Sequence, residues 1–233
     1  MNFSLIVPAA ANKDIYSTQL PKIFHLNDKG LFLCVEAILG LDLDLFSAIY
    51  FTILRQHDEQ YSIGAMLNMQ LKRVKIKNAK VVILDFPTSS QAETIYQTIC
   101  QEHINGAIFV KDADCTFSAD IYPQNGIVVY PLEKLTIVNP QHKSYVAVDD
   151  MSYITNTIEK RVIDHYFNAG GYCFEDALVF CHYFERYSTL QGLFLSHIVY
   201  SMLLDKHIFK PYLADSYKDL ELNENNYLNF WER

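Results

Sequence analysis

Cysteine is scarce in this sequence, and its arrangement excludes the structural roles that cysteine most often has. The 233 residues contain five cysteines, an odd number, and no two of them have CxxC spacing. Disulfide frameworks and structural zinc sites depend on paired, regularly spaced cysteines. We therefore expect neither, and reduced thiols in a cytoplasmic protein fit the sequence better.

Long hydrophobic runs are also missing. No apolar stretch reaches the ~18 residues needed to cross a bilayer, so no membrane span is expected. The segment SLIVPAAA at residues 4–11 resembles a signal peptide with a small-residue cleavage site, but it lacks a basic region and its apolar part is very short. We interpret residues 5–7 instead as a buried strand that leads into a loop.

Positive charge is in deficit. The chain has 19 Lys and Arg against 27 Asp and Glu, which gives a formal net charge of −8. A general nucleic-acid binder needs clustered Lys and Arg to neutralise phosphates, so no nucleic-acid partner is expected. We interpret the basic residues between 72 and 80 as the solvated end of a helix and its exit loop. Any phosphate-bearing partner should be small, with a metal ion mediating the contact.

The motifs of several common hydrolases are absent as well. The eight histidines form no HExxH pair. The sequence also contains no GxSxG elbow and no Cys–His signature, so hydrolase chemistry has no support.

The chain has enough apolar residues for a real core, since 50% of its residues are hydrophobic and 20% are charged. In its first part, apolar strands alternate with helical segments. This alternation predicts parallel βαβ units and a three-layer α/β sandwich with a mostly parallel central sheet. The strands are expected at 5–7, 48–54, 80–84 and 107–110, and the helices at 31–39, 58–73 and 90–104.

The second part of the chain has shorter strands and predicts a mixed α+β lobe. Strands are expected at 127–130, 145–148, 152–158 and 171–174, and helices at 177–184 and 191–204. No Pro- or Gly-rich linker, low-complexity tract or internal repeat separates the two parts. We therefore predict a single domain over residues 1–233.

Two carboxylates follow the fourth predicted strand directly. Ligands of open α/β sheets bind outside the carboxyl ends of the strands, where Asp112 and Asp114 could approach one divalent cation. Such oxygen ligands suit Mg²⁺ or Mn²⁺, which are held by one or two carboxylates plus phosphate oxygens. The alternative is a solvated turn in which the aspartates bond to nearby backbone.

Further segments each have a functional and a structural interpretation. Lys22 could neutralise a phosphate as a point charge, or be an exposed loop residue. Residues 88–94 open a helix and could hold a phosphate or a base, or simply cap that helix. Glu159 could accept hydrogen bonds from sugar hydroxyls, or form a surface ion pair with Lys160. The glycine pair at 170–171 could let the backbone approach a ligand, or form a bulge.

The order of these segments resembles the family of nucleotidyltransferases that activate sugar 1-phosphates, which have the nucleotide-diphospho-sugar transferase fold. The resemblance runs from Leu5 to about Phe230 and rests on short motifs in sequence order. They are LIVPAA at 5–10, LPK at 20–22, SQAET at 90–94, FVKDAD at 109–114, IEK at 158–160, AGGY at 169–172 and YKDLE at 217–221. The last is a weakened form of the family's Trp-x-Asp-x-Gly-Thr segment.

The resemblance implies roles for particular residues. Lys22 and Asp112 would be catalytic, and Asp112, Asp114 and Asp219 would be the candidate metal ligands. Nucleotide contacts are implied for Ala9, Ala10, Lys13, Ser90, Gln91, Ala92 and Thr94. Sugar-phosphate contacts are implied for Glu159, Lys160, Gly170 and Gly171. Residues 1–125 would then be a nucleotide-binding half, and residues 126–233 a sugar-binding half.

One segment departs from the family's pattern. Where the family has Gly-x-Gly-x-x-x-Arg, residues 11–17 of this chain read ANKDIYS, without either glycine and without the Arg. Side chains at these positions would crowd a close approach of the backbone to a triphosphate. Lys13 could replace the charge of the Arg but not its bidentate geometry.

Three functions therefore remain open. The first is an enzyme that uses Mg²⁺ or Mn²⁺ to join a nucleoside triphosphate and a sugar 1-phosphate, for surface polysaccharide synthesis. The second is a catalytically degenerate protein that binds a nucleotide or sugar nucleotide. The third is a glycosyltransferase that uses the same Asp-x-Asp. The Pro-Lys and Glu-Lys pairs favour nucleotidyl transfer over glycosyl transfer, whereas the altered loop favours the degenerate protein. A homo-oligomer is compatible with the sequence.

Overall fold

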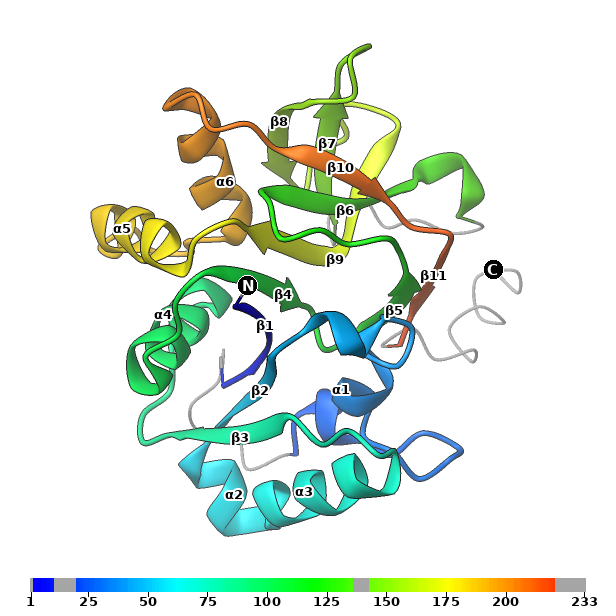
Figure 1. Cartoon of the computed structure of the whole chain (residues 1–233), viewed down its shortest axis with the longest axis vertical. Helices are drawn as coiled ribbons and strands as arrows, with labels where there is room; N and C mark the ends of the chain where they lie inside the picture. Colours follow the sequence, from blue (N-terminus) through cyan, green and yellow to red (C-terminus); the bar gives the residue numbers. More distant parts are fainter. Residues whose placement is uncertain (1, 11–19, 136–142, 221–233) are drawn as a thin grey trace, which may run out of the picture.

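Figure 1 shows the computed structural model of the chain, which describes residues 2–10, 20–135 and 143–220. Its main sheet has nine strands, and its continuous path has the order β10-β6-β9-β4-β1-β2-β3. β5 (Cys115–Ser118) and β11 (Ser216–Asp219) form a separate two-stranded antiparallel sheet. No helix within these ranges is long and apolar enough to cross a membrane.

One half of the main sheet is parallel. It contains β1 (Phe3–Ala9), β2 (Ala48–Leu54), β3 (Ala79–Leu84) and β4 (Ala107–Lys111). β1 pairs in parallel with both β2 and β4, and β2 pairs in parallel with β3. Every residue of β1 and β4 is buried, as expected for central strands that are covered on both faces. The predicted alternation of strands and helices around a parallel sheet is therefore confirmed.

The second lobe is built around β9 (Tyr166–Phe174). This strand runs antiparallel to β4 on one side and to β6 (Gly126–Pro131) on the other. β6 pairs in parallel with β10 (Lys210–Leu213), while β7 (Ser144–Val148) pairs antiparallel with both β8 (Ile154–Glu159) and β9. The predicted mixed α+β lobe is confirmed, and the sheet runs without a break across the predicted boundary between its two halves.

Helices cover both faces of the sheet and complete three layers (Figure 1). The helices are α1 (Leu33–Glu36), α2 (Arg55–Tyr61), α3 (Ile63–Arg73), α4 (Gln91–Glu102), α5 (Ala177–Tyr187) and α6 (Leu195–Leu204), with short 3₁₀ helices η1 (Lys22–Phe24), η2 (Leu43–Leu45) and η3 (Leu132–Lys134). Successive side chains of a strand point to opposite faces. Leu5 and Val7 therefore join the core beneath α1 and α3, whereas Ile6 joins the core beneath α4, α5 and α6.

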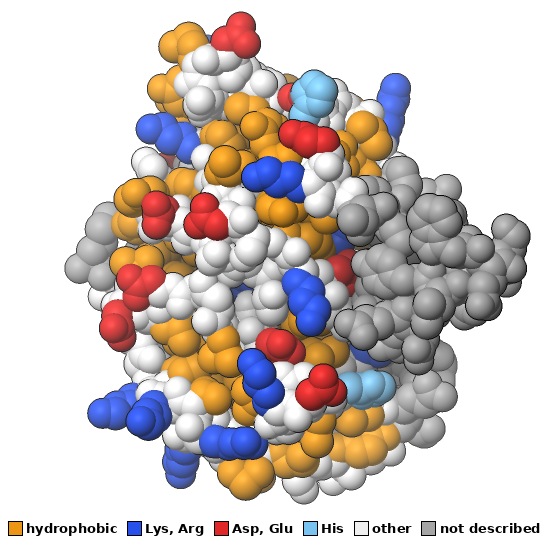
Figure 2. All heavy atoms as spheres, turned by 90° about the vertical axis from the view of Figure 1, so that its right-hand side faces the viewer, with side chains coloured by type: hydrophobic (Ala, Val, Ile, Leu, Met, Phe, Trp, Pro, Cys, Tyr) orange, Lys and Arg blue, Asp and Glu red, His pale blue; other side chains and the backbone are white. Residues whose placement is uncertain are grey.

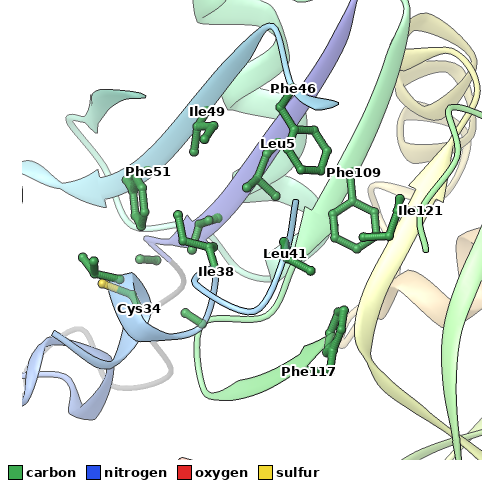
Figure 3. Packing of buried hydrophobic residues seen from close by; sticks show 14 of the residues in the cluster. Leu5, Cys34, Ile38, Leu41, Phe46, Ile49, Phe51, Phe109, Phe117 and Ile121 are labelled. Carbon is green, nitrogen blue, oxygen red and sulfur yellow. The ribbon is translucent and has the colours of Figure 1, made fainter. Parts of the chain in front are cut away.

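Figure 3 shows the core beneath α1. Leu5, Ile49 and Phe109 come from three adjacent strands and pack in one cluster with Ile38 and Leu41. A fully buried Leu or Ile side chain contributes about 1.5–3 kcal/mol relative to an exposed one. This layer therefore fixes β1 and β4 in the sheet, and with them the point at which β4 ends.

Two predicted helices have different bounds in the structure. The helix predicted over 58–73 is divided between α2 and α3, because Ser62 adopts φ 55° between them. The Asp58 carboxylate accepts a hydrogen bond from the Gly64 N–H at 2.7 Å and so caps the new helix. The helix predicted over 31–39 is limited to α1, followed by turns.

Three short strands were not predicted. β5, β10 and β11 have only four residues each. Their pairing partners lie far away along the chain, so a local pattern cannot reveal them. One of these pairs, β5 with β11, shapes the candidate site.

Surface charge is mixed on the face shown in Figure 2. Lys and Arg side chains are scattered over it, and Asp and Glu side chains lie between them. Several charged side chains also line a cavity at the carboxyl end of β4.

Candidate functional site

A cavity of about 160 Å³ opens at the carboxyl end of β4, the position expected for a ligand site in this kind of sheet. Its walls come from the β4–β5 connection, from β7, β8, β9 and β11, and from the first residues of α4 and α6. The described residues that line it are Gln91, Asp112, Asp114, Cys115, Lys143, Ser144, Glu159, Asn168, Ala169, Gly170, Tyr172, Phe194, Leu195 and Tyr217. The structure thus brings several predicted site residues together from distant parts of the sequence.

Asp112 is positioned by two other elements. Its backbone N–H donates to the Gly170 carbonyl of β9 at 2.8 Å. Its carboxylate accepts a hydrogen bond from the side-chain amide of Gln91, the first residue of α4. These contacts orient the carboxylate toward the cavity that it lines.

Gly170 lies at a β-bulge, where the register between β6 and β9 shifts. It has φ 87°, and a Cβ at this position would lie 2.5 Å from Cys115 Sγ and 3.0 Å from an Asp112 carboxylate oxygen. Only glycine fits here, for both reasons. The Asn168 side-chain oxygen accepts hydrogen bonds from the N–H groups of Gly170 at 2.8 Å and Gly171 at 3.2 Å, which satisfies two groups that the bulge frees.

Lys111, the last residue of β4, is completely buried beneath residues 112–114, the acidic loop that connects β4 to β5. Its ammonium group donates to the carbonyls of Asp112 at 2.7 Å and Cys115 at 2.8 Å, and to Cys115 Sγ at 3.1 Å. It also lies 4.5 Å from the centre of the Phe117 ring. Burial raises the pKa of the Cys115 thiol to about 12, so the thiol stays protonated and donates to the Ala169 carbonyl at 3.2 Å. Lys111 thereby ties the two ends of the loop together.

Asp219 reaches the same region through the β5–β11 pair. It stands opposite Cys115 in the antiparallel register, and the N–H of the next residue, Leu220, donates to the Asp114 carbonyl at 2.8 Å. The pairing therefore places Asp219 beside Asp114, although Asp219 follows it by 105 positions in the sequence. Asp219 is not itself among the lining residues, but it contacts one of them, Lys143.

Lys143 stands immediately before β7 and lines the cavity. Its ammonium donates to an Asp219 carboxylate oxygen at 2.9 Å and to the Tyr217 hydroxyl. It also lies 4.9 Å from the centre of the Tyr217 ring and 5.6 Å from that of Phe167. Two aromatic rings and one carboxylate thus hold this cation at the wall.

The carboxylates of the cavity repel one another. Burial raises the pKa of Asp114, and the nearby charges of Asp112 and Asp219 raise it further, while Lys111 and Lys143 act in the opposite direction. A divalent cation would relieve this repulsion, and carboxylate oxygens are the donors that Mg²⁺ and Mn²⁺ prefer. No ready-made cluster of three or more His, Cys, Asp or Glu side chains for a metal occurs in the described part of the chain. The donor set fits an ion that is held by one or two carboxylates together with phosphate oxygens.

Other residues of the cavity offer hydrogen-bonding groups. Glu159, near the end of β8, accepts a hydrogen bond from the Ser196 hydroxyl of α6. Burial, reinforced by the charge of Glu159, raises the pKa of the Tyr172 hydroxyl well above its ordinary value, so this group stays protonated. Lys160 lies outside the lining, with its ammonium 5.6 Å from the centre of the Phe194 ring.

None of the remaining predicted residues that the structure describes is among the lining residues of the cavity. Lys22 is exposed at the start of η1 and is not among the described lining residues, so its contact with a phosphate stays a prediction. Ala9 and Ala10 are buried at the end of β1. Gly171 is packed among Val128, Phe109 and Phe117, and serves the core. Lys13 lies outside the described residues.

The segment at 90–94 is largely occupied with its own helix. The Ser90 hydroxyl accepts from the Glu93 N–H at 3.2 Å and caps α4. Ala92 is buried in the core, and the Thr94 hydroxyl bonds to that of Thr88 at 2.6 Å. Helix capping, the structural interpretation of this segment, is therefore observed. Gln91 is the residue of the segment that lines the cavity.

Sequence reasoning missed the two lysines of the site. Lys111 gave a signal, since a charged residue ends an otherwise apolar strand, but its burial could not be foreseen. Lys143 gave none, because its partners Tyr217 and Asp219 lie more than 70 positions away.

Comparisons with known proteins identify the fold. No family model and no curated protein matches the sequence. Among solved structures, a nucleoside-diphosphate-sugar pyrophosphorylase from Vibrio cholerae RC9 has a TM-score of 0.71 at 14% identity, over 98% of this chain and 100% of that one. The inositol-1-phosphate CTP transferase from T. maritima has a TM-score of 0.72 at 16% identity, over 98% and 94%. HddC from Yersinia pseudotuberculosis, complexed with GMP-PN, has a TM-score of 0.59 at 13% identity, over 100% and 99%.

These likenesses confirm the predicted fold class, an α/β sandwich of the nucleotide-diphospho-sugar transferase type. At such low identity they show the fold and leave the activity to be argued from the site.

Proposed function

We propose that this chain is an enzyme that joins a nucleoside triphosphate to a sugar 1-phosphate and releases pyrophosphate, in the supply of nucleotide sugars for surface polysaccharides. One observation carries the proposal: a single cavity is lined both by the aspartates that follow β4 and by polar groups of β8 and β9. The aspartates are Asp112 and Asp114, with Asp219 close to Asp114, and the polar groups include Glu159 and Asn168. The aspartates suit metal-bound phosphates, and the polar groups suit sugar hydroxyls.

In the proposed reaction, a phosphate oxygen of the sugar 1-phosphate attacks the α-phosphorus of the nucleotide in line. A new P–O bond forms, and the bond from the α-phosphorus to the leaving pyrophosphate breaks. Asp112, with Asp114 and Asp219, would hold Mg²⁺ or Mn²⁺, which when bound neutralises charge on the phosphates. Glu159 would accept hydrogen bonds from the sugar, and Gln91 holds the Asp112 carboxylate in its orientation.

A second function has an observation in its favour. The segment ANKDIYS at 11–17 lacks the glycines and the Arg that the resembled family uses on the triphosphate. A protein that binds a nucleotide or sugar nucleotide without turnover would tolerate this loss. A glycosyltransferase that uses the Asp112–Asp114 pair is a further alternative, and a donor sugar nucleotide would be its substrate.

A pyrophosphate-release screen across nucleoside triphosphates and sugar 1-phosphates, with Mg²⁺, tests the proposal. Release above background with one pair supports it. If no pair reacts and calorimetry detects a bound nucleotide, the binding protein replaces the enzyme as the best account. If the chain neither reacts nor binds any nucleotide, the functional reading of this cavity is wrong and the fold assignment alone stands.

A further inference from the structure

Lys143 is the one cationic side chain among the described residues that line the cavity. Three carboxylates line the same cavity, and a fourth, that of Asp219, contacts the lining residue Lys143. A phosphate that entered would meet this excess of negative charge. Among the described residues, Lys143 is therefore the side chain best placed to attract a phosphate inside the cavity.

The ammonium of Lys143 is already engaged, in a pair that is more enclosed than the other ion pairs of the described chain. Its side chain is 18% exposed and that of Asp219 is 19% exposed, whereas at least one partner of every other pair is more than 45% exposed. Such enclosure reduces screening by water and salt. An ammonium has three N–H donors, and the described contacts with Asp219 and Tyr217 account for two.

The pair places each of its members in competition with a ligand. A divalent ion that binds Asp219 alone must first displace the Lys143 ammonium. A phosphate that binds Lys143 alone must compete with the Asp219 carboxylate. When both ligands arrive together, each member of the pair gains a new partner of opposite charge, and neither charge is left uncompensated in a partly buried place.

We propose that Lys143 and Asp219 form an exchangeable ion pair, in which Lys143 holds the Asp219 carboxylate in the free protein and turns to a phosphate group when Asp219 turns to a divalent ion. The inference rests on the proposed function in one respect, namely that the ligand carries phosphates. It makes Lys143 a phosphate-binding residue and explains how the cavity accepts phosphate and metal as a unit. The chain therefore binds a divalent ion and phosphate with positive coupling.

Two separate binding measurements test the exchange without relying on turnover. One is the affinity for Mn²⁺ alone, followed by electron paramagnetic resonance. The other is the affinity for inorganic pyrophosphate without metal, in EDTA, followed by calorimetry. In Lys143→Met, Mn²⁺ should bind about threefold more tightly because Asp219 is released. Pyrophosphate should bind at least about tenfold more weakly, since a charge-assisted hydrogen bond is lost.

Asp219→Asn should give the mirror image, with Mn²⁺ weaker and pyrophosphate tighter than in the wild type. In the double variant, the gain in Mn²⁺ affinity from Lys143→Met should disappear, because Asp219 is no longer there to be released. A long-range charge effect would instead leave that gain in place. Lys143→Arg should retain pyrophosphate binding. The matched control is Lys134→Met, since Lys134 is an exposed lysine that also lies over an aromatic ring, 5.7 Å from the centre of Tyr130.

Circular dichroism and thermal unfolding establish that each variant is folded, and Asp219→Asn carries the test alone if Lys143→Met does not fold. Shifts of the two affinities in the same direction, or no shift, overturn the exchange. If that happens while the wild type still releases pyrophosphate from some substrate pair, the exchange is wrong and the proposed function stands. If the wild type binds neither Mn²⁺ nor pyrophosphate, the exchange is overturned whatever the screen shows.

Discussion

The aspartates at the cavity come from two segments of the chain, and the two segments are held in place by different kinds of contact. On one side, Asp112 and Asp114 belong to a loop that is tied down from below by the buried Lys111 and from β9 by the Gly170 carbonyl. On the other side, Asp219 ends a two-stranded sheet, and the side chain that holds it, Lys143, itself lines the cavity.

This contrast separates a preorganised part of the site from an adaptable one. On the first side the contacts involve backbone carbonyls and a buried ammonium, whereas the ion pair on the second side lies at the cavity wall and would change partners in the exchange proposed above. A site for a metal-bound phosphate needs both properties, because at least one ligand must be fixed and another must respond to the incoming charge.

Gly170→Ala should have the largest effect, because it disturbs the preorganised part of the site, the loop of Asp112 and Asp114. This part is called the fixed side below, and the Lys143–Asp219 pair with Tyr217 the adaptable side. The added Cβ would meet Cys115 Sγ at 2.5 Å, in a backbone conformation of φ 87° that alanine rarely adopts. We expect a loss of more than ~3 kcal/mol in the free energy of unfolding, measured by denaturant titration, together with loss of Mn²⁺ binding. Gly192→Ala is the matched control: Gly192 has φ 70° but nothing within 4 Å, so only about 1 kcal/mol should be lost. Equal losses would contradict the close packing described for Gly170.

Lys111→Met should have the next largest effect. The substitution keeps the length of the side chain but leaves the buried carbonyl of Cys115 and the part-buried carbonyl of Asp112 without their donor. Each unsatisfied buried acceptor costs about 1–3 kcal/mol, so denaturant unfolding should report a loss in that range or above. Lys80→Met removes a lysine whose side chain is 61% exposed in a surface ion pair, and should cost less than ~1 kcal/mol. If the Lys111 variant were as stable as the Lys80 variant, Lys111 would not be the residue that holds the loop of Asp112 and Asp114 in place.

Tyr217→Phe should have a smaller effect, confined to the adaptable side. It removes the hydroxyl that accepts from Lys143 and keeps the ring on which the ammonium lies. We expect a loss of about 0.5–1.5 kcal/mol in the free energy of unfolding and unchanged Mn²⁺ binding at Asp112. A loss as large as that of Lys111→Met would mean that the two sides are equally rigid.

The smallest expected effect is on the pH dependence of stability, and it comes from His57, which lies outside the candidate site. His57 of α2 is buried next to Phe24, and burial lowers its pKa. Since the unfolded chain then takes up the proton first, stability is complete above the ordinary His pKa and falls as pH falls toward the lowered value. His57→Phe should abolish this part of the pH dependence in metal-free denaturant unfolding. An unchanged profile in the variant would assign the dependence to other groups.

The sequence predicted the parallel half of the fold well because its signals are local. β1 and β4 are short apolar runs that are covered on both faces, and the Ser90 hydroxyl caps α4 within the segment 88–94 that was expected to open a helix. The β5–β11 pair could not be predicted in the same way, since it joins four-residue strands that lie about 100 positions apart.

The candidate site was predicted in part for the same reason. Asp112 and Asp114 follow a clear strand, and the bulge at Gly170 was one of two interpretations of a visible glycine pair. Lys111 and Lys143 escaped prediction because their roles depend on burial and on partners brought by tertiary structure. The glycine-poor segment at 11–17 remains the feature that most favours a binding protein over an enzyme.

The most direct test of the central claim is the rate of pyrophosphate release by Asp112→Asn, measured with the substrate pair that the wild type uses. If Asp112 holds the ion that neutralises the phosphates, the variant should be folded and slower by at least about a hundredfold. Asp150→Asn alters an exposed turn aspartate outside the cavity and should react like the wild type. A folded Asp112→Asn protein that releases pyrophosphate at the wild-type rate would contradict the assignment of this cavity as the site of nucleotidyl transfer.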